Sequence, residues 1–164
     1  MLQTNLPLPT GSLLGRYRDE GHFTDCYAYD VGKTVALSGF IEAFYTTGPF
    51  RLERQILKFA VKAPSSHNDV KALAAGETDT FAAWKVEARE PDQILLNAGT
   101  TRSWLKVAAR AEAATRLYFG SAVLKTNTGS DGAKTLKPTY QALMGFHALY
   151  SRILLTSAAK SLAL

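Results

Sequence analysis

The segment from Pro138 to about Leu162 constrains the fold more than any other part of the chain. It is largely apolar and, after its first residue, it contains no proline and one glycine, Gly145. Proline suits the first turn of a helix, because its missing N–H would have no partner there. We predict one helix of roughly 25 residues, which at about 1.5 Å per residue can cross the whole face of a sheet. Polar residues interrupt the segment, so no membrane span is expected: they are Gln141, His147, Arg152, Ser157 and Lys160.

Five other segments alternate apolar and polar residues with the two-residue period of half-buried strands. They are residues 21–31, 81–89, 93–97, 102–108 and 115–125. Short connections join the last four, which is typical of hairpins, and we therefore predict an antiparallel sheet.

The alternation also assigns side chains to the two faces of this sheet, since residues two apart point the same way. The expected groups are Arg102, Trp104 and Lys106 opposite Ser103, Leu105 and Val107; Arg116, Tyr118 and Gly120 opposite Leu117, Phe119 and Ser121; and Trp84, Val86 and Ala88 opposite Lys85, Glu87 and Arg89. Both faces carry bulky groups. Such a pattern fits a curved sheet with one ligand-holding face, and equally a sheet packed against a helix.

Apolar spacing changes to that of a helix after the first predicted strand. Residues 34–45 have apolar side chains every three or four positions, which predicts a helix. A second helix should begin at Pro49 and run through residue 61. A third, short helix is expected at residues 68–75, between a Ser66 cap and Gly76. Residues 126–137 are polar and contain glycine, which predicts a loop.

The composition, 46% apolar and 20% charged over 164 residues, predicts a single globular domain covering residues 1–164. The net charge of +5 is uneven: residues 1–100 carry ten basic and twelve acidic side chains, whereas residues 101–164 carry nine and two. These basic residues occur singly and the signature of an RNA-recognition strand is absent, so nucleic acid is not the expected partner. Cys26 is the single cysteine, which together with an N-terminal stretch unlike a signal peptide favours a cytoplasmic protein.

Two local motifs suggest cofactors, but neither has the required spacing. The phosphate-loop-like string at residues 129–135 has two residues between its glycines instead of four. Potential metal ligands cluster at residues 19–26 without a metal-binding spacing: they are Asp19, Glu20, His22, Asp25 and Cys26. We expect neither a metal nor a cofactor. Among the three histidines, His147 could bring a titratable group into the apolar interior, although a hydrogen-bonded core histidine is the plainer interpretation.

The order of strand, two helices, antiparallel strands and long final helix resembles the helix-grip fold of the START/Bet v 1-like (SRPBCC) superfamily. Within it, the chain is similar to uncharacterised bacterial proteins of the DUF2867 kind. The resemblance covers residues 16–162 and rests on residues 40–61, 81–89, 101–107, 115–123 and 140–155. It implies an α+β fold in which a curved antiparallel sheet wraps around the long C-terminal helix. Further strands would lie in residues 1–20 or 62–80. A nuclear-transport-factor-like cone, which should end on a strand, is the alternative.

Members of that superfamily hold an apolar or amphipathic small molecule between the sheet and the last helix. The resemblance therefore implies a ligand site, lined by Trp84, Arg102, Trp104, Tyr118, Leu143, His147 and Tyr150. Our first hypothesis is a protein that binds a hydrophobic small molecule there without a cofactor. One alternative is a cyclase or dehydratase that uses His147, or a group of Glu53, Arg54 and Arg102, for acid–base work. Another is a basic surface module for an acidic partner or nucleic acid.

Overall fold

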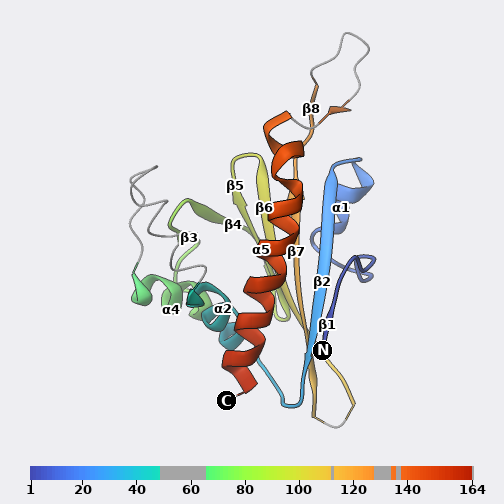
Figure 1. Ribbon diagram of the computed structural model, residues 1–164. Coiled ribbons are helices and arrows are strands. Elements are labelled where there is room, and N and C mark those ends of the chain that lie inside the picture. The colour runs from blue at the N-terminus through green and yellow to red at the C-terminus, as the bar shows by residue number, and fades with distance from the viewer. Residues whose placement is uncertain (49–65, 112, 128–133, 136–137, 164) are drawn as a thin grey trace.

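A seven-stranded antiparallel sheet organises the structure, a computed structural model that describes residues 1–48, 66–111, 113–127, 134–135 and 138–163 (Figure 1). At residues 126–127, 134–135 and 138–146 it describes the course of the backbone. The strands of the sheet are β1 (Leu2–Gln3), β2 (Phe23–Val31), β3 (Thr80–Phe81), β4 (Trp84–Glu90), β5 (Gln93–Ala98), β6 (Thr101–Ala109) and β7 (Thr115–Val123). The described helices are α1 (Gly15–Asp19), α2 (Leu37–Tyr45), α4 (His67–Ala75) and α5 (Pro138–Ala163).

The strands lie in the order β1-β2-β7-β6-β5-β4-β3, and every neighbouring pair is antiparallel. β4 to β7 form the predicted meander, and β2 pairs along the whole of β7. The α+β class and the antiparallel sheet are therefore confirmed. Of the strands that the sequence pattern lacks, β1 lies within residues 1–20 as expected, while β3 comes from the start of the segment that was predicted as one strand.

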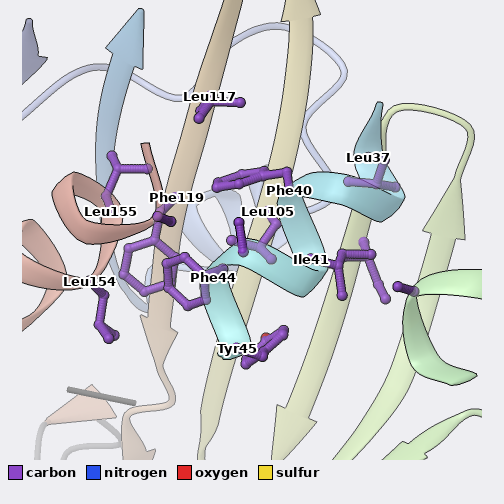
Figure 2. Packing of buried hydrophobic residues seen from close by; sticks show 14 of the residues in the cluster. Leu37, Phe40, Ile41, Phe44, Tyr45, Leu105, Leu117, Phe119, Leu154 and Leu155 are labelled. Carbon is purple, nitrogen blue, oxygen red and sulfur yellow. The ribbon is translucent and has the colours of Figure 1, made fainter. Parts of the chain in front are cut away.

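α5 crosses one face of the sheet, which we call the inner face, and α2 and α4 lie on the same side of the sheet (Figure 1). The bounds of α5 confirm the predicted final helix. Phe44 of α2 lies against Phe119 of β7 with ring centroids 4.8 Å apart. Leu154 and Leu155 of α5 pack beside them (Figure 2). Among the described residues, no helix is long and apolar enough to cross a membrane.

The outer face of the sheet is covered by the N-terminal strap, which we define as residues 6–17. Leu14 and Tyr17 of the strap are buried against the outer-face side chains of the sheet, which are Cys26, Leu95, Trp104 and Ala122. The sequence pattern gives no sign of this layer, because the strap has neither a helical nor a two-residue period over most of its length. Both faces of the sheet are therefore packed against protein.

Gln93 fastens the strap to the outer face and is itself only 1% exposed. Its Oε1 accepts hydrogen bonds from the backbone N–H of Leu13, at 3.0 Å, and from the indole N–H of Trp104, at 2.8 Å. Its Nε2 donates to the carbonyl oxygen of Gly11 at 2.9 Å. One buried amide thus satisfies groups from both layers, as buried polar groups require.

A β-bulge in β4 overturns part of the predicted alternation. Val86 pairs with Leu96, but Ala88 pairs with the next residue back, Leu95, so that one residue of β4 is left over. The extra residue reverses the faces beyond it. The prediction that Ala88 shares a face with Val86 is wrong, since Ala88 packs on the outer face. Arg89 instead turns inward and donates to the carbonyl oxygen of Leu73 in α4 at 2.7 Å.

The helix predictions agree with the structure in part. The helix expected at residues 34–45 is α2, which begins at Leu37. α4 begins with a capping box, in which Ser66 and Asp69 bond each other's backbone N–H, and ends at Gly76 with a φ of 79°. Both signals match the expected cap and stop. The helix predicted at residues 49–61 lies outside the described residues. The loop predicted at residues 126–137 is wrong in part, because β8 (Thr126–Asn127) and β9 (Lys134–Thr135) pair there.

Gly120 of β7 lies in close contact with its neighbours on the outer face, and we expect Gly120→Ala to lower stability. An added Cβ would lie 2.7 Å from the carbonyl oxygen of Asp25 and 3.1 Å from atoms of Leu14 and Trp104. Overpacking of this kind costs about 1–3 kcal/mol. Urea denaturation should show the loss. As the matched control, Gly39→Ala in α2 meets no atom within 4 Å and should be neutral or stabilising by up to about 1 kcal/mol. Equal effects of the two variants would contradict the prediction.

Gln93→Leu should destabilise the protein by at least about 2 kcal/mol, because it leaves the buried indole N–H of Trp104 and the part-buried backbone N–H of Leu13 without an acceptor. Thermal or urea unfolding measures the change. The control is Gln3→Leu in β1, where the amide makes a single long contact of 3.5 Å to Asp30. A Gln93→Leu variant as stable as wild type would mean that the strap does not depend on this amide.

Candidate functional site

Three neighbouring strands place polar side chains in one row across the otherwise apolar inner face. Asp25 of β2 lies opposite Ser121 of β7, and Ser121 lies opposite Ser103 of β6. The next inward residues along β2 and β7 are Tyr27 and Phe119, which belong to the apolar core. We call Asp25, Ser121 and Ser103 the polar row. It lies between the sheet and the helices rather than at the surface: Ser103 and Ser121 are buried and the Asp25 side chain is 10% exposed.

α5 brings His147 onto the polar row. The Nε2 atom of His147 is 2.8 Å from Oγ of Ser121 and 3.2 Å from Oδ2 of Asp25. Asp25 Oδ1 in turn accepts from both the backbone N–H and the hydroxyl of Ser121, each at 2.7 Å. The imidazole remains 32% exposed. An acid, a hydroxyl and an imidazole therefore meet at one point between the sheet and the final helix.

The residues on either side of Asp25 have altered acidity. Burial, with the Asp25 charge as a smaller cause, raises the pKa of the Cys26 thiol to about 12. Burial also raises the pKa of Tyr27, and the charge of Asp25 and a hydrogen bond to it act in the same direction; Arg152 of α5 opposes them. Both groups therefore stay protonated near neutral pH, which leaves Asp25 as the negative charge of the site.

Two polar atoms near the inner face are buried without a hydrogen-bond partner among the described residues. They are the Oγ atom of Ser151 and the indole Nε1 atom of Trp84. Ser151 follows His147 by one helical turn, so the two side chains lie on the same side of α5. At the other end of the polar row, the Ser103 hydroxyl is 3.4 Å from the Tyr45 hydroxyl of α2. This region thus has hydrogen-bonding capacity that the described side chains do not use.

The structure divides the residues that we expected to line one ligand site. Trp84, His147 and Tyr150 lie on the inner side, where Trp84 and Tyr150 pack against the core. Trp104 and Tyr118 lie on the outer face with ring centroids 6.1 Å apart, against the strap. Our expectation that these two rings face the final helix is wrong. Their mutual placement was predicted correctly, but the alternation cannot say which layer covers which face.

Arg102 also lies on the outer face, and its placement there corrects a second expectation. Its Nε atom is 2.7 Å from the Tyr17 hydroxyl and 2.6 Å from Oε2 of Glu87. Arg16 pairs with Glu87 as well. Arg102 therefore holds the strap and does not reach His147. The other members of its proposed acid–base group, Glu53 and Arg54, lie outside the described residues, as does the side chain of Leu143.

Ion pairs take up part of the basic charge of residues 101–164. Arg116 binds Asp30 through two bonds of 2.6 and 2.7 Å, and Lys106 pairs with Asp92. The Arg116 hydrogen bonds hold the pKa of Asp30 below its ordinary value. Each of these cations is matched by an acid from the first hundred residues, so they do not form a free basic patch for nucleic acid.

The cluster of potential metal ligands at residues 19–26 is dispersed by the strand. Asp25 points inward and Cys26 outward. His22 accepts a bond from the backbone N–H of Lys125 at 3.1 Å. Within the described part of the chain, no group of three or more such side chains could hold a metal ion. The phosphate-loop-like string lies largely outside the described residues.

A surface depression of about 490 Å³ lies at the far end of the sheet from the polar row. It is lined by the turn after β2, the β6–β7 connection and Asp92. No residue that we singled out from the sequence as a ligand contact lines it. We therefore regard the polar row with His147 as the candidate site.

Asp25 and Ser121 were not recognised as site residues from the sequence, although a signal for Asp25 was present. Asp25 occupies the same phase as Phe23, Tyr27 and Tyr29 in a strand whose inward residues are otherwise apolar or aromatic. A charged residue in the buried phase of a strand has to be paired or functional. Ser121 carries no such signal, because a small hydroxyl residue is common in strands.

Comparisons with known proteins identify no family for this chain. No protein-family model matches the sequence, and no curated protein does. Among solved structures, a conserved protein of unknown function from Enterococcus faecalis is similar over 85% of this chain and 71% of its own, with 8% identity and a TM-score of 0.39. A similarity of this degree is too weak to transfer a fold or a function.

The raised pKa of Cys26 predicts an alkaline loss of stability. The unfolded thiol loses its proton near its ordinary pKa of 9.0, whereas the folded one keeps it to about 12. Between these values the folded state binds more protons, so stability should fall as pH rises. Urea denaturation at several pH values should show this slope, and Cys26→Ala should reduce it. A slope unchanged in Cys26→Ala would contradict the assignment, and native Cys26 should also react slowly with thiol reagents.

Proposed function

We propose that the protein binds a hydrophobic or amphipathic small molecule between the inner face of the sheet and α5, with its polar end at the polar row. The observation that carries the proposal is the buried Ser151 hydroxyl, which has no partner in the described structure and lies one turn from His147. Buried polar atoms are nearly always hydrogen-bonded, so a bound molecule or water is needed to satisfy this one.

The surroundings of the polar row support an amphipathic ligand. Aromatic and aliphatic side chains of α2, β7 and α5 extend from the row along the inner face, as Phe44, Phe119 and Leu155 illustrate (Figure 2). Small-molecule sites combine such apolar walls with a few polar groups that fix orientation. The partly buried Trp84, whose indole N–H is unpartnered in the described structure, offers a second polar contact toward the far edge of the sheet.

We infer in the same way that the fold is of the helix-grip kind, similar to the START/Bet v 1-like superfamily and its DUF2867-type members. The supporting observations are the antiparallel sheet, the helices after the first long strand and a final helix that crosses the inner face. In that superfamily the ligand lies between sheet and final helix, which is where the polar row is found.

Native mass spectrometry of protein purified from cells tests the proposal. We expect an added mass that is retained under native conditions and lost on denaturation. Ser151→Leu should abolish it, because the larger side chain both removes the hydroxyl and occupies space beside His147. Ser157→Leu, the same change six residues further along α5, is the matched control and should retain the mass.

Circular dichroism should confirm that both variants are folded. Wild-type protein that carries no added mass, even after incubation with an extract of cellular small molecules, would contradict the proposed function. An equal mass in wild type and Ser151→Leu would place the ligand elsewhere and contradict the location.

A further inference from the structure

The hydrogen-bond directions at the polar row fix which nitrogen of His147 carries the proton. The Ser121 hydroxyl donates to Oδ1 of Asp25, and a hydroxyl has a single hydrogen to give. The Ser121 oxygen therefore presents a lone pair to Nε2 of His147, 2.8 Å away. Oδ2 of Asp25, 3.2 Å from the same nitrogen, is also an acceptor. Since two acceptors converge on Nε2, that nitrogen carries the hydrogen.

The alternative, in which Nδ1 of the neutral ring carries the hydrogen and Nε2 does not, is unfavourable. If Nε2 lacked a hydrogen, its lone pair would face the carboxylate oxygen of Asp25, and the two would repel each other. A neutral ring with hydrogen on Nε2 has a lone pair on Nδ1. Nδ1 has no hydrogen-bond partner among the described residues, and the ring is partly exposed. The polar end of the site therefore offers an acceptor to whatever binds there.

The same geometry excludes a hydrolase-type role for Ser121. In a Ser-His-Asp triad the acid and the nucleophile bond different nitrogens of the imidazole, so that the histidine can take the serine proton. Here Asp25 and Ser121 both approach Nε2, and the Ser121 hydroxyl donates its hydrogen bond to Asp25 instead of to His147. Ser121 and Asp25 are thus positioning residues, which hold the ring and its tautomer.

The charges around His147 disfavour an anionic ligand. Asp25 is largely buried and its neighbour Tyr27 stays protonated, so the sheet side of the site carries one negative charge. Arg152, exposed on α5, is the cation whose charge reaches Tyr27. A carboxylate placed at Nδ1 would meet a lone pair, and beyond it the Asp25 charge.

We propose that the ligand presents an uncharged hydroxyl group, which donates a hydrogen bond to Nδ1 of His147. The inference rests on the proposed function and adds the ligand class: a neutral apolar alcohol instead of a fatty acid. The hydroxyl oxygen keeps its own lone pairs, one of which the unpartnered hydroxyl of Ser151 can meet as a donor.

Decanol and decanoate form a matched pair of probes, since they share a chain and differ at the polar end. Calorimetric titration should be done at a pH at which NMR shows the His147 ring to be neutral. We expect decanol to bind at least about tenfold more tightly than decanoate, a difference of about 1.4 kcal/mol. Equal or tighter binding of decanoate would overturn the inference and point to Arg152 as the recognising group. Binding of neither probe, by protein from which the retained cellular ligand has been removed, would also overturn it.

Two variants connect the preference to the polar row. Asp25→Asn removes the negative charge and should bring the two affinities within about threefold of each other. His67→Ala, a change at an exposed histidine of α4, is the control and should keep the wild-type preference. An Asp25→Asn variant that is folded and keeps the full preference would contradict the charge argument.

Nitrogen NMR of the wild-type imidazole provides a readout that does not depend on any variant. The spectrum should show His147 protonated at Nε2 and unprotonated at Nδ1, with the Nδ1 shift changing when decanol is added. Protonation at Nδ1 in the neutral ring would overturn the inference. The proposed function would survive that result, because it is tested separately by the retained mass.

Discussion

The sheet has two apolar faces, and the structure depends on covering both of them. β7 shows the requirement most directly, because it lies in the middle of the sheet and its side chains alternate between the two layers. Phe119 and Ser121 face the helices, whereas Gly120 faces the strap at a distance that leaves no room for a Cβ. In β7, Gly120 thereby allows the strap to approach the sheet closely, and the adjacent Ser121 belongs to the candidate site. A shift of one residue in the register of β7 would turn Gly120 toward the inner face and Ser121 toward the outer face.

Sequence patterns predicted the elements better than their arrangement. The final helix, α4 with its cap, and the strands of the meander were recognisable because periodicity and capping are local properties. Which layer covers each face depends on contacts between distant segments. The strap has no periodic pattern of apolar residues from which its position on the outer face could be predicted. For this reason Trp104 and Tyr118 were grouped correctly and assigned to the wrong layer. The bulge in β4 was missed for a similar reason, since no glycine or proline marks it.

The candidate site shows the same division. His147 was singled out because a histidine in an apolar helix is conspicuous in the sequence. Its partners come from β2 and β7, 122 and 26 residues away in the chain, and only the register of the sheet brings Asp25 and Ser121 together. The pairing of charged side chains also depends on segments that are distant in the sequence. Residues 1–100 and 101–164 differ in net charge, yet the pairs Asp30 with Arg116 and Asp92 with Lys106 join an acid from the first segment to a base from the second.

The edges of the sheet carry a consequence for how the molecule meets its own copies. A long exposed edge strand offers unpaired backbone groups to another chain, and is a common start of aggregation. This sheet ends on both sides in strands of two residues, β1 and β3, and β1 is followed at once by the strap. β1 and β3 themselves therefore offer few N–H and C=O groups to a neighbouring strand. β1 and β3 each pair with only two residues of the longer strand beside them, β2 and β4. Another chain that added a strand would therefore have to pair with the remaining outer edge of β2 or β4 and not with β1 or β3.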